Sequence, residues 1–179
     1  MRYRMMVPVL ALACGAPGED STTEDDAATI SAPITPAIAI LHDTAGSEVG
    51  RVTLAQTDSG ISVIGRIDGF AQGERGIHVH ATGSCSPTFE AAGPHWNPAD
   101  KSHGLDNPDG PHQGDLSNVA FQSDSSGQVD GFIRGAGLRS MGGLIDADGA
   151  AIVLHHSRDD QRTDPAGNSG ARVACGVVE

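Results

Sequence analysis

The sequence predicts an all-β fold, an antiparallel sandwich or barrel. Short runs rich in β-branched residues recur from residue 37 onward, and turn sequences such as Asp58-Ser59-Gly60 separate them. The composition agrees, because 24 glycines and 10 prolines in 179 residues favour many turns and few long helices. The length fits one domain of ordinary size with a real core, plus tails.

Eight short runs are expected to form the strands of this fold. They are residues 37–41, 49–56, 61–67, 76–80, 116–122, 128–133, 150–155 and 171–178. Their length and the Gly/Asp turns between them are typical of an antiparallel sandwich or barrel. The sequence contains no heptads, no internal repeat and no Gly-rich phosphate loop.

The N-terminus, residues 1–14, has the outline of an export signal. Arg2 and Arg4 precede an apolar run at residues 7–13, which is too short for a bilayer span of about 20 residues. The segment resembles a bacterial lipoprotein signal, in which the cysteine after a small residue, here Cys14, is lipidated. We therefore expect a protein exported to the bacterial periplasm or cell envelope and anchored by lipid. The alternative is an ordinary cleaved signal, with Cys14 discarded.

Residues 15–35 carry five acidic and no basic residues and are rich in Ser, Thr, Ala and Pro. Such a segment cannot bury enough apolar surface to offset its ordering entropy, so we expect a flexible tether before a domain at residues 36–179. The formal charge of the chain is −12. Leaving out the signal and the tether, 18 acidic and 9 basic residues remain, a net of −9. The basic residues form no cluster, so no nucleic-acid partner is expected.

Residues 93–115 are rich in Gly and Pro, have no helical or strand periodicity, and contain His95, His103, His112 and Asp115. A loop this long inside a compact domain usually has a functional reason. Any one of these histidines alone would be interpreted as a surface residue. Three imidazoles and a carboxylate together are the number and type of donors that a closed tetrahedral zinc site requires. We therefore expect a structural metal.

Three further histidines lie on expected strands. His78 and His80 are two residues apart, so both imidazoles project from one face of a strand. His155 and His156 end an apolar run, and only one of them can share a face with the inward residues. Seven donors exceed the needs of one ion, and an all-imidazole group suits copper.

The chain from about residue 76 to residue 178 resembles a copper/zinc superoxide dismutase of bacterial type. The resemblance rests on His-Val-His at 78–80, Gly-Pro-His-Trp-Asn-Pro at 93–98, His-Gln-Gly-Asp-Leu at 112–116, Leu-His-His-Ser-Arg-Asp-Asp at 154–160 and Gly-Asn-Ser-Gly-Ala-Arg-Val-Ala-Cys-Gly-Val at 167–177. Residues 36–75 resemble the family only in pattern. Trp96 stands where an aromatic ring of another kind is usual.

The resemblance implies an eight-stranded Greek-key sandwich or barrel with long metal-binding and electrostatic loops, and copper and zinc as cofactors. It implies two ligand sets that share one residue: His78, His80, His95 and His155 for copper, and His95, His103, His112 and Asp115 for zinc. Asp159 matches a carboxylate that links a ligand of each metal, and Arg172 matches an arginine beside the copper channel. Cys85 and Cys175 match the disulfide of the family.

The implied activity is dismutation of superoxide to dioxygen and hydrogen peroxide, with His95 and Arg172 taking part in catalysis. A redox-cycling copper would perform the electron transfer, and zinc would be structural. The alternative is a non-catalytic, metal-binding cell-envelope protein on the same fold. A zinc hydrolase would need an open metal position and a general base, whereas the loop offers a closed set of four donors. A homodimer is left open, because the sequence does not set its geometry.

Overall fold

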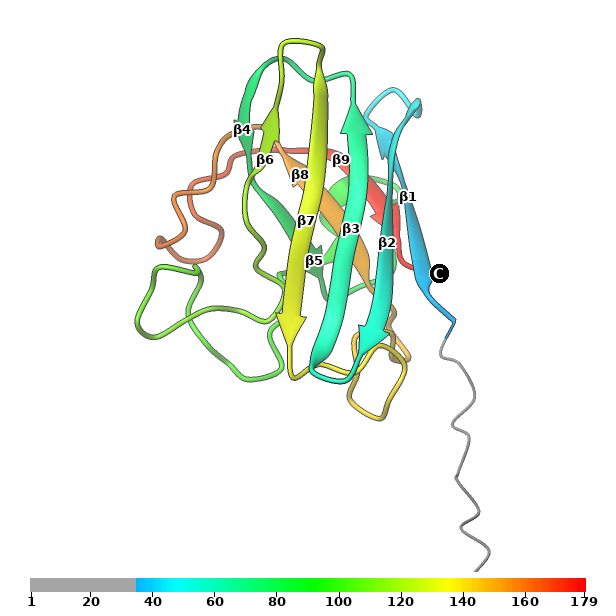
Figure 1. Cartoon of the computed structure of the whole chain (residues 1–179), viewed down its shortest axis with the longest axis vertical. Helices are drawn as coiled ribbons and strands as arrows, with labels where there is room; N and C mark the ends of the chain where they lie inside the picture. The colour runs from blue at the N-terminus through cyan, green and yellow to red at the C-terminus, as the bar shows by residue number, and fades with distance from the viewer. Residues whose placement is uncertain (1–34) are drawn as a thin grey trace, which may run out of the picture. The chain divides into compact units, whose positions relative to one another are not determined.

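The computed structural model describes residues 35–179, which form a nine-stranded antiparallel sheet (Figure 1). The order of the strands in the sheet is β4-β6-β7-β3-β2-β1-β9-β8-β5. One short 3-10 helix, η1, lies between β5 and β6 in the sequence. The bounds of the elements are β1 Ala37–Asp43, β2 Glu48–Thr57, β3 Gly60–Asp68, β4 Gly73–Arg75, β5 Ile77–His80, η1 Phe89–Ala92, β6 Val119–Phe121, β7 Ser126–Arg134, β8 Ala151–His155 and β9 Arg172–Val177.

The two ends of this sheet belong to one extended stretch of chain. β4 and β5 are separated only by Gly76, yet β4 pairs with β6 and β5 pairs with β8. Because the two end strands of the sheet are consecutive in the chain, the sheet curves into a nearly closed barrel. Strands distant in sequence are neighbours, β1 with β9 and β3 with β7, as in a Greek key. The predicted all-β fold class is confirmed, although there are nine strands rather than eight, because β4 forms a separate short strand.

The barrel core follows from the alternation of side chains along each strand. In β1, Ala37, Ala39 and Leu41 are fully buried, whereas Ile38 is 37% exposed. In β5 all four residues are buried, and Ile77 and Val79 belong to the main apolar cluster. His78 and His80 lie on the opposite face of β5, so their burial requires a second layer over that face.

The second layer is made of loops that fold over β5. The backbone N–H of Val79 donates to the carbonyl of Gly114, and the N–H of Trp96 donates to the carbonyl of Val79, each at 2.8 Å. His78 and His80 also form isolated bridges with Asp115 and His95. The loop between β5 and β6 therefore pairs with the edge of β5 that β8 does not use.

A disulfide attaches the start of this loop to the last strand. The sulfur atoms of Cys85 and Cys175 are 1.99 Å apart, and their Cα atoms are 5.9 Å apart. The pairing that the resemblance implies is therefore confirmed. It holds η1, which follows Cys85 along the chain, beside β9.

Among the described residues, no helix has the length and apolar character needed to cross a membrane. The predicted export signal with Cys14, and the predicted tether up to residue 34, lie outside the described residues.

Candidate metal centre

Four buried histidines converge beside β5 and β8. His78 and His80 come from β5, His155 ends β8, and His95 comes from the covering loop. One ligand nitrogen of each lies within 4.8 Å of the corresponding nitrogens of the other three. The isolated bridge between His80 and His95 brings the loop histidine to the strand histidines.

In each of these four rings one nitrogen has a partner and the other has none. The partnered nitrogens are His78 Nε2 at 2.7 Å from Asp159 Oδ2, His80 Nδ1 at 2.8 Å from the Gly93 carbonyl, His155 Nδ1 at 3.1 Å from the Gly170 carbonyl and His95 Nδ1 at 2.8 Å from Asp115 Oδ1. The buried nitrogens without a partner are His78 Nδ1, His80 Nε2, His95 Nε2 and His155 Nε2. An unpaired buried polar atom costs about 1–3 kcal/mol, and one metal ion would satisfy all four. The hydrogen bonds on the far nitrogens are those that orient metal-ligating histidines.

A second group of donors surrounds the carboxylate of Asp115. Its Oδ1 lies 2.8 Å from His95 Nδ1, 3.0 Å from His103 Nδ1 and 3.4 Å from His112 Nδ1. The Nδ1 atoms of His95 and His112 are also 3.4 Å apart. Donors about 2.0 Å from a tetrahedral zinc are about 3.3 Å from one another, so these spacings fit that ion.

His78 also lies within 4.8 Å of His95, His103 and Asp115, and so competes with His112 as the fourth donor. His112 is the better fourth donor of the second group, because both ring nitrogens of His78 are already assigned. The Nε2 of His78 contacts Asp159, and the Nδ1 of His78 belongs to the first group. His95 belongs to both groups, with Nε2 in the first and Nδ1 in the second.

Two buried carboxylates hold the groups in place. The Oδ2 of Asp115 accepts hydrogen bonds from the backbone N–H groups of Gly104, at 2.8 Å, and His112, at 3.0 Å. Asp159 joins the two groups, because it contacts His78 Nε2 at 2.7 Å and His103 Nε2 at 3.0 Å. Asp159 therefore fixes the orientation of one histidine in each group.

Burial keeps the first group of histidines neutral. Burial, together with the neighbouring imidazoles, lowers the pKa of His78 to about 3, of His80 to about 2 and of His155 to about 4. Burial also lowers the pKa of His95. Neutral imidazoles have the free lone pairs that a metal requires.

Two carboxylates at the second group, Asp115 and Asp159, are ionised. Burial opposes ionisation of Asp115 and Asp159, but hydrogen bonds to His103 and other groups outweigh burial and hold both pKa values well below the usual range. Burial lowers the pKa of His103, but hydrogen bonds to Asp115 and Asp159 raise it by more, so that the pKa of His103 is raised to about 9. Two ionised carboxylates attract a cation to this site.

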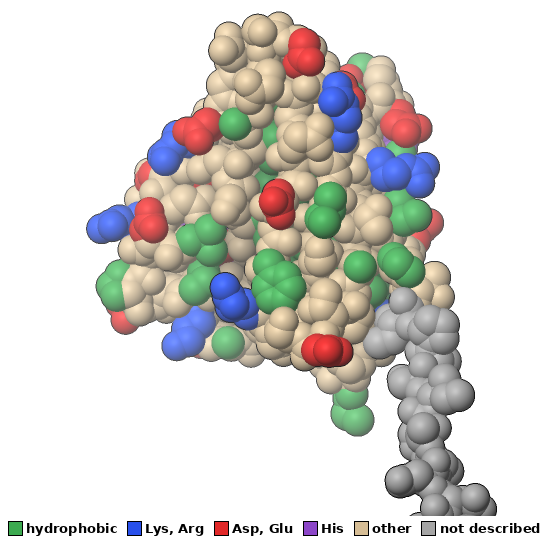
Figure 2. Space-filling model, in the orientation of Figure 1, with side chains coloured by type: hydrophobic (Ala, Val, Ile, Leu, Met, Phe, Trp, Pro, Cys, Tyr) green, Lys and Arg blue, Asp and Glu red, His purple; other side chains and the backbone are tan. Residues whose placement is uncertain are grey.

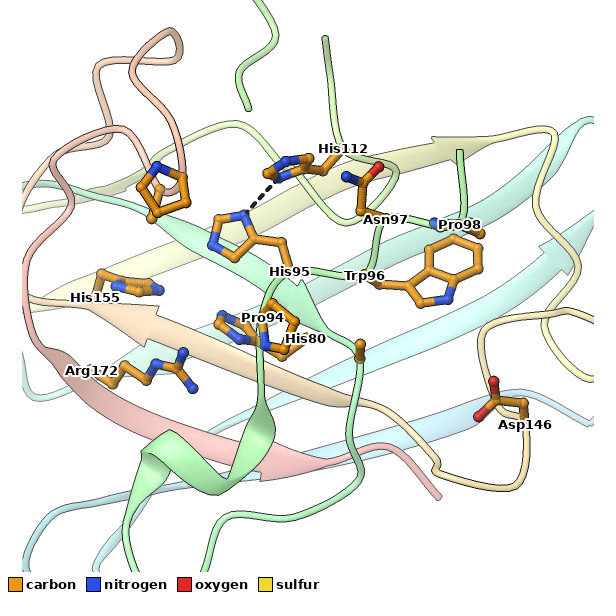
Figure 3. A pocket seen from close by; sticks show the side chains of 13 residues that line it. His80, Pro94, His95, Trp96, Asn97, Pro98, His112, Asp146, His155 and Arg172 are labelled. Atoms are coloured by element: carbon orange, nitrogen blue, oxygen red, sulfur yellow. Dashed lines mark hydrogen bonds between the residues drawn. The ribbon is translucent and has the colours of Figure 1, made fainter. Parts of the chain in front are cut away.

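A cavity of about 590 Å³ gives access to the first group. Its lining includes His80, His95, His155 and Arg172, which Figure 3 shows on one side, with Trp96 and Asp146 on the other. Arg172 donates from Nη1 to the Phe89 carbonyl and from Nη2 to the Gly93 carbonyl, each at 2.7 Å. Burial lowers the pKa of its guanidinium, which nevertheless stays charged at neutral pH.

The structure brings together all seven predicted donors, with Asp159 between the groups and Arg172 beside the cavity. His42 and His156 belong to neither group and are exposed. Arg158, near His155 in the sequence, pairs with Glu74 at 2.8 Å.

Two contacts of the site were not foreseen. Gly167, with φ of 61°, packs so closely against Asp159 that a side chain would overlap the carboxylate. Glu90 lies near the guanidinium of Arg172. A Gly-Asn-Ser-Gly run signals a turn at residues 167–170, but nothing in the sequence shows which residue the turn touches.

Comparison with known proteins gives consistent matches over the same region. The family model of copper/zinc superoxide dismutase matches residues 48–178. The Cu-Zn superoxide dismutase 2 of Aquifex aeolicus is 38% identical over 144 residues, which are 77% of this chain and 83% of that protein. The Cu-Zn superoxide dismutase of Caulobacter vibrioides is 36% identical over 148 residues, 80% of this chain and 85% of that protein.

A solved structure supports the same conclusion. The crystal structure of a SOD-like protein from Bacillus subtilis superposes with a TM-score of 0.73 at 34% identity, and the match covers 78% of this chain and 96% of that one. The match of the family model and the identity to both relatives extend over most of the domain described above. The chain therefore belongs to the copper/zinc superoxide dismutase family, and the metals that its donor groups suit are copper and zinc.

Proposed function

We propose that this protein dismutates superoxide to dioxygen and hydrogen peroxide. The observation that carries the proposal is the set of four buried ring nitrogens without a partner, three of whose residues line a cavity that also contains Arg172. Copper, when bound there, supplies the one-electron chemistry of the reaction. Zinc has no redox chemistry and would be structural.

In this proposal the donors divide between the metals by atom. Copper would be held by His78 Nδ1 and by Nε2 of His80, His95 and His155. Zinc would be held by Nδ1 of His95, His103 and His112 and by Oδ1 of Asp115. His95 would offer a nitrogen to each metal, and its Nε2 can hold and release a proton beside the cavity whenever it is not bound to copper. Peroxide formation needs protons, so His95 is the expected source of one of them.

Arg172 is proposed to bind and orient the anionic substrate. Two of its five N–H donors are used by the Phe89 and Gly93 carbonyls, which fixes the guanidinium and leaves others for an anion. Charge reversal in Arg172→Glu should lower the second-order rate by on the order of tenfold or more and weaken its decline with ionic strength. Metal contents should not change.

The experiment that tests this function combines metal analysis with a dismutation assay on the purified, metal-loaded protein. His155→Ala should remove copper and abolish activity. His112→Ala should instead lower zinc content and thermal stability. A parent protein with full copper and zinc but no dismutation would support the alternative, a non-catalytic metal-binding protein of the cell envelope.

We also propose export with a lipid anchor at Cys14, on the strength of the signal-like residues 1–14. The disulfide supports export, because disulfides persist mainly in oxidising compartments. The mature protein should fractionate with membranes, and Cys14→Ser should release it or block its processing. A mature N-terminus downstream of residue 14 without lipid, found by mass spectrometry, would exclude the anchor.

A further inference from the structure

The cavity beside the first donor group has little positive charge with which to attract an anion. Among the described residues that line it, Arg172 is the only Lys or Arg, and Asp146 is the only Asp or Glu. On the face shown in Figure 2, Lys and Arg side chains lie scattered among Asp and Glu. Residues 36–179 carry a net charge of −9. The attraction of an anion to the cavity therefore depends strongly on how far the positive charge of Arg172 is neutralised by its neighbours.

Arg172 has a counterion. Its Nε lies 3.4 Å from Oε2 of Glu90, and its two Nη atoms donate to the carbonyls of Phe89 and Gly93. All three partners belong to η1 and the residue that follows it. The side chain of Arg172 is 15% exposed and that of Glu90 is 75% exposed, so the carboxylate lies on the solvent side of the pair.

Glu90 approaches Arg172 from outside the main cavity. Glu90 and Arg172 line a second cavity, of about 300 Å³, and Glu90 is not among the residues that line the first. The disulfide keeps the pair together, because Cys85 precedes η1 and Cys175 lies on β9 with Arg172. The carboxylate can therefore neutralise the guanidinium without blocking the route of an anion.

We propose that Glu90 limits the rate at which anions reach the metal centre, by partly neutralising Arg172. The inference rests on the proposed function, because it concerns the same substrate and the same arginine. A purely structural role is the weaker explanation, since an exposed ion pair contributes little to stability and Arg172 is already held by two backbone carbonyls.

The expected size of the effect follows from Coulomb's law. One unit charge about 7 Å from an anion, in water, changes the anion's local concentration about threefold. Glu90→Gln should therefore raise the second-order rate about threefold at low ionic strength, and Glu90→Lys about tenfold. Both gains should shrink as salt reduces the Debye length to about 3 Å at 1 M.

The experiment measures the rate with superoxide against ionic strength for the metal-loaded parent, Glu90→Gln, Glu90→Lys and a control, Glu74→Gln. Glu74 also pairs with an arginine, is 50% exposed and does not line the main cavity, so the control makes the same change in net charge elsewhere. A second measurement is independent of turnover. Azide affinity is read by visible absorption of the copper- and zinc-loaded proteins, and phosphate is titrated against the Arg172 Nε–H signal in copper-free protein by NMR.

We expect azide and phosphate affinity and the rate to be highest in Glu90→Lys, intermediate in Glu90→Gln and lowest in the parent. The control Glu74→Gln should equal the parent. Equal rates and affinities at all salt concentrations would overturn it, and so would a control that matches Glu90→Gln. If the loaded parent lacks dismutation, the proposed function fails, while the anion affinities still decide the role of Glu90.

Discussion

At the scale of single residues, the site depends on one glycine as well as on its donors. Gly167 has a positive φ of 61° and packs against Asp159, the carboxylate that contacts His78 and His103. Asp159 can occupy its position only because residue 167 has no side chain. The glycine therefore determines the orientation of one donor in each group.

Gly167→Ala should displace Asp159 and weaken both metal sites. Outer partners of metal ligands are typically worth 10–100-fold in affinity, and a loss in this range is expected for zinc and copper in chelator competition. The matched control is Gly135→Ala, which has a similar φ of 66° but nothing within 4 Å of an added Cβ. Equal affinities in the two variants would mean that backbone strain alone, not contact with Asp159, explains any loss.

At the scale of elements, a strand could be predicted from the sequence where the alternation of buried and exposed side chains is enough to define it. β2, β3 and β7 lie close to the expected runs, because their β-branched residues alternate toward the core. β4, Gly73–Arg75, has no such pattern and is a strand only because β6 lies beside it. Conversely, residues 116–118 were expected in a strand, but Leu116 and Asn118 bond instead to Gln161 and Asp159.

The site follows the same division. Spacing in the sequence placed His78 and His80 on one face, and clustering in the Gly- and Pro-rich residues 93–115 indicated the four donors of the loop. Glu90 and Gly167 could not be predicted, because their importance arises from contacts with Arg172 and Asp159 that only the fold creates. A glutamate in a short 3-10 helix and a glycine in a loop carry no local signal of such contacts.

The disulfide should make a large contribution to the stability of these elements. It joins residues 90 positions apart, and in the chain-entropy model a loop of this length is worth roughly 4 to 5 kcal/mol. Cys85→Ser with Cys175→Ser should lower the free energy of unfolding by up to that amount, as measured by urea denaturation of the metal-loaded protein. An unchanged midpoint would show that metal binding alone holds η1 beside β9.

At the scale of the whole molecule, the buried histidines should make the metal-free protein sensitive to acid. His78, His80 and His155 have folded pKa values of about 3, 2 and 4, below the value of about 6.5 for unfolded chains. As the pH falls below 6.5, the unfolded chain binds protons that the folded one does not, and stability falls by up to about 1.4 kcal/mol per pH unit for each histidine.

His103 acts in the opposite direction. Its pKa is raised to about 9, so its contribution is fully present below pH 6.5 and is lost as the pH rises through 9. Urea denaturation of the metal-free protein from pH 4 to pH 10 should therefore show greatest stability near neutrality. His42→Gln, a change at an exposed histidine, should leave the profile unaltered, and a flat profile between pH 7 and pH 5 would contradict the expectation.

The backbone of Val79 is bonded to the loop that carries the second group of donors. Its N–H and carbonyl are both bonded to the covering loop, at Gly114 and Trp96, on the edge of β5 that faces away from β8. That same loop supplies His95, His103, His112 and Asp115, so ions bound by these donors would also help to keep this edge covered. Detachment of the loop would leave an open strand edge, which is a template for pairing with another chain. We therefore expect loss of metal to favour aggregation at the strand that carries His78 and His80.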